Sequence, residues 1–78
     1  MMDESQLYQL RWDVQAHFEQ VYGHPLVCEF LEFHPLANGT VLFDVTISKE
    51  RSPIGRFSGF TGYRDHHFFL TKLAHPEA

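Results

Sequence analysis

The sequence predicts a small α+β domain in which a single N-terminal helix packs on a four-stranded antiparallel β-sheet meander. An apolar repeat of about 3.6 residues near the N-terminus indicates a helix, and apolar patterns with a period of two across the remainder indicate strands. The connections between these strands are short, which favours antiparallel neighbours. With 78 residues, of which 44% are hydrophobic, the chain is expected to form one domain spanning 1–78.

The helix is expected at residues 4–22. Asp3 can cap its N-terminus, and Gln6, three residues later, completes a capping box. Gly23 followed by Pro25 ends it. Large apolar side chains share one arc of about 80° and form the expected core face of the helix: Leu7, Leu10, Val14, Phe18 and Val21.

Period-two patterns predict four strands, at about 26–34, 40–48, 56–61 and 66–73. The last residues, 74–78, are expected to form a frayed tail. Asn38-Gly39 is the clearest hairpin turn in the chain. The segment 49–54 contains three charges and Pro53, which is typical of a surface loop. Glycines among aromatic residues indicate that the third strand is distorted, and a turn is expected at 63–65.

The strands carry more apolar surface than one helix can cover. A helix about 10 Å wide covers about half of a four-stranded sheet roughly 19 Å across. In the first strand, one apolar set is expected to oppose another: Val27, Leu31 and Phe33 against Leu26, Cys28 and Phe30. Leu42 likewise faces away from Val41. We therefore expect a partner to cover the far face, unless strong curvature rolls the sheet around the helix.

The charge is unevenly distributed. Residues 1–48 hold seven acidic side chains and one basic, a balance of −6, whereas residues 49–78 hold five basic and three acidic, a balance of +2. This asymmetry suits an electrostatically steered contact. The acidic half is expected to meet a basic surface, such as that of a nucleic-acid-handling protein.

The sequence contains no recognisable catalytic, cofactor-binding or metal-binding motif. Cys28 is the only cysteine, so an internal disulfide and a sulfur-ligated metal centre are excluded. None of the six histidines has a spacing that places two ligands on one face of an element. We therefore expect no enzyme, no metal and no cofactor. Because no apolar run approaches the length of a membrane span and the first residues are acidic, we expect a cytoplasmic location.

These features predict a non-catalytic protein-binding or regulatory module: an inhibitor, adaptor or assembly factor that occludes or organises a macromolecular partner. Trp12 and Tyr8 lie about 160° and about 120° from the centre of the apolar stripe. The alternative is that Trp12 folds against the first strand or the tail. A homodimer is the first assembly to expect. The expected partner-binding residues are Tyr8, Trp12, Glu19, Leu31, Phe33, Leu42, Arg56, Phe60, Tyr63 and Arg64.

Two alternatives remain. Cations alternate with aromatics in a pattern that suits stacking of single-stranded nucleic acid: Arg56, Phe57, Phe60, Tyr63, Arg64 and Phe69. The net charge of −4 opposes the nucleic-acid hypothesis, because an acidic chain repels phosphates. The second alternative is a small enzyme, or a subunit of one, that uses histidine residues.

Overall fold

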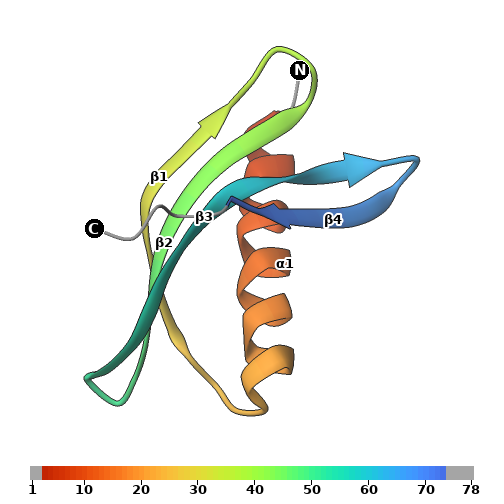
Figure 1. Cartoon of the computed structure of the whole chain (residues 1–78). Coiled ribbons are helices and arrows are strands. Elements are labelled where there is room, and N and C mark those ends of the chain that lie inside the picture. Colours follow the sequence, from red (N-terminus) through yellow and green to blue (C-terminus); the bar gives the residue numbers. More distant parts are fainter. Residues whose placement is uncertain (1–2, 74–78) are drawn as a thin grey trace.

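The computed structural model describes residues 3–73 and has one helix on a four-stranded antiparallel sheet, which confirms the predicted α+β class (Figure 1). The strands follow one another in the order β1-β2-β3-β4, so each pairs with its neighbours in sequence. The elements are α1 (Glu4–Tyr22), β1 (Val27–Pro35), β2 (Thr40–Lys49), β3 (Ser52–Arg64) and β4 (His67–Lys72). Within the described residues, α1 is not apolar enough to cross a membrane.

Both ends of α1 are fixed by the predicted signals. The Asp3 carboxylate accepts a hydrogen bond from the backbone N–H of Gln6 at 2.9 Å, and the Gln6 side chain accepts one from the Asp3 N–H at 3.0 Å. Gly23 has a left-handed backbone, with φ of 78°, and its N–H donates to the Glu19 carbonyl. Glycine adopts this conformation without steric cost, so it ends the helix at the expected place.

The core lies between α1 and the concave face of the sheet. From α1 it takes Leu10, Val14 and Phe18, which are spaced four residues apart and have no exposed surface. Alternate residues of β2 face them, because successive side chains of a strand point to opposite faces. These are Val41, Phe43, Val45 and Ile47.

The predicted core face of α1 is wrong at its C-terminal end. Val21 falls in the apolar arc, yet 57% of its surface is exposed. Figure 1 shows the reason: the β3–β4 hairpin crosses the N-terminal part of the helix, whereas the last turn of α1 diverges from the sheet. Periodicity gives the direction of a side chain but not whether another element lies there.

The third strand begins at Ser52 and is longer than predicted, because no loop separates it from β2. The chain reverses at Glu50 and Arg51, both with positive φ (48° and 73°), as in a two-residue type I′ turn. Asp65 and His66 do the same between β3 and β4, with φ of 51° and 64°. The expected loop at 49–54 and the expected turn at 63–65 are therefore both replaced by tight two-residue turns.

A β-bulge in β1 changes the faces on which its side chains lie. The pairing with β2 shifts between Phe30 and Glu32, so Leu31 is the extra residue. Phe30 and Phe33 consequently both face α1, with ring centroids 5.2 Å apart. The prediction that Phe33 lies with Val27 and Leu31, opposite Phe30, is therefore wrong.

The convex face of the sheet is mixed rather than continuously apolar. Glu32, Asp44 and Ser58 are cross-strand neighbours there. Leu42 does face outward, as expected, and lies opposite Phe60, but both are partly buried. Because the bulge turns Phe33 inward and the sheet curls around α1 (Figure 1), the far face is less apolar than expected, although Leu42 and Phe60 remain on it.

Candidate functional site

A groove runs between α1 and the edge strand β1. It consists of two adjoining hollows of about 440 and about 280 Å³ that share Tyr8 and Arg11. We call it the α1–β1 groove, and its lining residues are Glu4, Leu7, Tyr8, Arg11, Trp12, Gln15, Cys28, Glu29, Phe30 and Phe33. The structure therefore brings together Tyr8, Trp12 and Phe33, three of the residues expected to bind a partner.

Two aromatic side chains on one wall of the groove are open to solvent. Trp12 is 66% exposed and Tyr8 is 59% exposed. They are four residues apart, so they lie on the same side of α1. The prediction that Trp12 points away from the core is confirmed, and Trp12 does not fold against the first strand. The tail at 74–78, the other expected cover, lies outside the described residues. Leaving an aromatic side chain this size in water forgoes about 1.5 to 3 kcal/mol of burial.

Arg11 lies over the aromatic floor of the groove. Its guanidinium carbon is 4.9 Å from the centroid of Phe30 and 5.4 Å from that of Phe33. Contacts of this kind contribute about 0.5 to 1 kcal/mol at exposed sites. Sequence reasoning missed Arg11. Its place beside Trp12 on the helix was visible, but the bulge that turns Phe33 toward it was not.

The other wall of the groove is an unpaired sheet edge. Among the described residues, β1 pairs with β2 on one side and with no strand on the other. The edge is regular from Val27 to Phe30, and the bulge at Leu31 and the Pro35 ring interrupt it further along. Val27 is 61% exposed and Leu31 is also exposed. An unpaired edge flanked by apolar side chains is a surface to which a second chain can add a strand.

Glu19, another expected partner-binding residue, is engaged within the fold. Its carboxylate accepts hydrogen bonds from the backbone N–H of Leu26 at 3.0 Å and from the Gln15 side chain at 3.3 Å. It thereby holds the start of β1 against α1, so a partner contact would compete with these bonds.

Burial, and then the negative charge of Glu19, raise the pKa of the Cys28 thiol, which keeps the thiol protonated.

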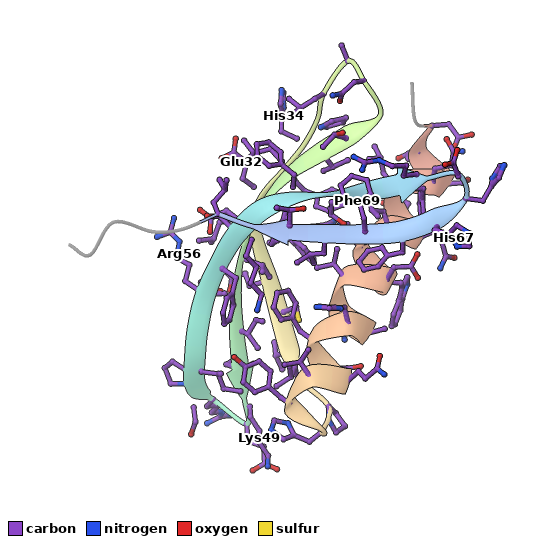
Figure 2. The ribbon with its side chains drawn as sticks, turned by 45° about the vertical axis from the view of Figure 1, so that its right-hand side comes forward. Glu32, His34, Lys49, Arg56, His67 and Phe69 are labelled. Atoms are coloured by element: carbon purple, nitrogen blue, oxygen red, sulfur yellow. The ribbon has the colours of Figure 1, made fainter. Side chains whose placement is uncertain are left out.

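The residues of the predicted cation–aromatic pattern are divided between the two faces of the sheet. Arg56, Phe60 and Phe69 belong to the convex face, on which Figure 2 labels Arg56 and Phe69. Arg64 is in the same set, and its guanidinium carbon is 5.1 Å from the Phe69 centroid. Phe57 packs instead against the core.

Arg56 is already paired on the convex face. Its Nε and Nη2 donate to the two carboxylate oxygens of Asp44 at 2.9 and 2.6 Å. This hydrogen bonding raises the pKa of the guanidinium, which stays charged. A phosphate would therefore have to compete with a carboxylate that Arg56 already binds through two hydrogen bonds.

Tyr63, the remaining expected site residue, turns toward α1. Its hydroxyl donates to the Asp13 carboxylate, and burial followed by this hydrogen bond raises the pKa of Tyr63. The two residues border a shallow hollow of about 330 Å³ that His17 and His66 also line. Burial, and then the positive charge of Lys72, lower the pKa of His17.

Within residues 3–73, no three His, Cys, Asp or Glu side chains are grouped to hold a metal ion. His75 lies outside the described residues.

Comparison with known proteins found no matching family model, no similar curated protein and no similar solved structure.

Proposed function

We propose that this chain is a non-catalytic protein-binding module whose α1–β1 groove receives a segment of another protein. The observation that carries the proposal is the placement of the exposed Trp12 and Tyr8 beside the edge of β1 that pairs with no other strand of the described residues. By binding a segment of its partner, the module would occlude or organise that partner, as an inhibitor, adaptor or assembly factor does. We propose that it does so in the cytoplasm, the location expected from the sequence.

The two walls of the groove support this function for different reasons. Exposed aromatic residues contribute little to folding, whereas tryptophan and tyrosine often dominate the energy of protein interfaces. An unpaired strand edge presents backbone N–H and C=O groups that a second chain can bind. The groove offers both within one surface, which a partner could bury together.

Partner capture with matched variants tests the proposal. The immobilised chain is exposed to an extract of its native cell, and the bound proteins are quantified by mass spectrometry. A Trp12→Ala substitution should weaken capture of the specific partner about thirtyfold, as a hot-spot loss of about 2 kcal/mol implies.

Tyr22→Ala is the control. Tyr22 is also an exposed aromatic residue of α1, but it does not line the groove. This variant should capture the partner as the unaltered chain does. Equal capture by the Trp12→Ala and Tyr22→Ala variants would contradict the proposal.

Single-stranded nucleic acid is the second candidate ligand, and it concerns the convex face. The stacking of Arg64 on Phe69 favours it, whereas the Arg56–Asp44 pair and the net charge of −4 oppose it. Salt-dependent retention of labelled single strands at about 50 mM salt, lost on Phe60→Ala, would support this candidate. No retention would eliminate it.

A further inference from the structure

We propose that the occupant of the α1–β1 groove is an extended basic segment of another protein. This segment pairs with Val27–Phe30 as a fifth strand and alternates large apolar with basic side chains. The inference rests on the proposed function and specifies the chemistry of the partner.

The alternation follows from the faces of β1. Cys28 and Phe30 point toward α1, whereas Val27 and Glu29 belong to the opposite face. An added strand has the same period of two. Its residues on the α1 side enter the groove beside Trp12, and the residues between them lie beside Glu29.

The length of the paired segment follows from the edge. Regular pairing is available over the four residues from Val27 to Phe30, before the bulge at Leu31. Four residues of a strand span about 13 Å. The residues of the added segment that face α1 must be apolar, because Phe30 and Phe33 form the aromatic floor of the groove and Trp12 lies above it.

The charge at the edge selects basic residues for the other positions. β1 carries Glu29 and Glu32, both exposed, and no lysine or arginine. Among residues 3–73, Arg11 is the only basic residue that lines the groove, and it lies over the rings of Phe30 and Phe33. Lysine or arginine in the added strand would therefore meet carboxylates that face solvent.

The same charges disfavour a second copy of the chain as the occupant. If β1 paired with its own copy, Glu29 and Glu32 would lie close to the same two residues of the copy. Like charges on neighbouring strands are destabilising. A segment of opposite charge avoids this repulsion and satisfies the same backbone groups.

Three synthetic peptides test the inference: one alternating valine and lysine, one alternating valine and glutamate, and a valine–lysine peptide whose backbone is N-methylated. Trp12 is the only tryptophan of the chain, so its fluorescence reports occupation of the groove. The valine–lysine peptide should shift this emission to the blue, with a Kd below about 1 mM. It should also protect from hydrogen exchange those amides of Val27–Phe30 that point away from β2.

The other two peptides separate charge from backbone pairing. The valine–glutamate peptide should bind at least about tenfold more weakly, because its carboxylates meet Glu29 in the paired stretch and approach Glu32 beyond it. The N-methylated peptide should not bind because it cannot donate backbone hydrogen bonds. Equal binding of the lysine and glutamate peptides, or binding without protection of β1, would overturn the inference.

A pair of neutralising substitutions provides the matched control. Glu29→Gln should weaken binding of the valine–lysine peptide about twofold to fivefold, the range expected for one exposed ion pair. Asp65→Asn removes the same charge at the β3–β4 turn and should change nothing. Equal effects of the two substitutions would show that net charge, rather than the edge of β1, drives binding, which would overturn the inference.

The outcomes separate this inference from the proposed function. If the peptides fail to bind while partner capture still requires Trp12, the fifth-strand inference is wrong and the protein-binding function stands. If capture is also insensitive to Trp12, both are wrong. A blue shift of Trp12 that grows with protein concentration, together with a dimer mass, would show that a second copy occupies the edge and would also overturn the inference.

Discussion

Replacing Trp12 with alanine should leave the stability of the fold almost unchanged. About one third of the indole is buried, since 66% of it is exposed. If full burial of such a side chain is worth about 1.5 to 3 kcal/mol, its loss here should cost about 0.5 to 1 kcal/mol. Alanine is also a better helix former than tryptophan, by about 0.5 kcal/mol. The free energy of unfolding should therefore change by less than about 0.5 kcal/mol.

Urea denaturation followed by far-ultraviolet circular dichroism measures this change without relying on the missing tryptophan. Phe18→Ala is the comparison, because the Phe18 ring has no exposed surface and packs against Phe57 at a centroid distance of 5.1 Å. Its removal should cost about 3 to 5 kcal/mol. A Trp12→Ala cost above about 2 kcal/mol would refute the reasoning, because Trp12 would then be part of the core rather than a binding residue.

Three further predictions concern the fold and its response to pH. Arg51→Gly and His66→Gly should each raise the free energy of unfolding by about 0.5 to 1 kcal/mol, because glycine tolerates positive φ; an unchanged thermal midpoint would contradict the turn geometry. Gly59→Ala should cost about 3 kcal/mol, since the new Cβ would lie 1.9 Å from the Thr71 carbonyl oxygen; wild-type stability in urea would show that β4 does not approach so closely. The fold depresses the pKa of His17 below 6.5, so protonation disfavours the folded state, and its stability should decline as pH falls through about 6.5 toward the lower folded value. His17→Gln should reduce this decline, and an identical pH profile would contradict the cause.

The elements that depend on local signals were predictable from the sequence. The capping box at Asp3 and Gln6 and the left-handed Gly23 determine the ends of α1 within a few residues, so no tertiary contact is needed to place them. The alternation of β2 likewise identified its buried face, because one side of that strand packs on α1.

The bulge and the tight turns were not predictable, because the usual residues are absent. Two-residue turns with positive φ usually contain glycine, whereas this chain uses Glu50-Arg51 and Asp65-His66, neither of which does. Nothing in the pattern of β1 marks Leu31 as an extra residue. One inserted residue moves Phe33 to the other face, because strand side chains alternate with a period of two.

The candidate site was predictable only where it depends on a single element. The helical wheel identified Trp12 and Tyr8 as exposed aromatics, since their directions depend on α1 alone. The opposite wall required knowing that β1 is an edge strand and that Phe30 and Phe33 share a face. The apolar character of the convex face was overestimated, because the apolar pattern of the strands does not show how strongly the sheet curves.

Hydrogen exchange of the chain with and without its captured partner is the most direct test of the α1–β1 groove. Both β1 and β4 are edge strands of the sheet that the described residues form, so the two edges can be compared in one measurement. Binding in the groove should slow exchange at Val27–Phe30 and leave His67–Lys72 unchanged. Slowed exchange confined to His67–Lys72, with Val27–Phe30 unaltered, would show that the partner binds elsewhere.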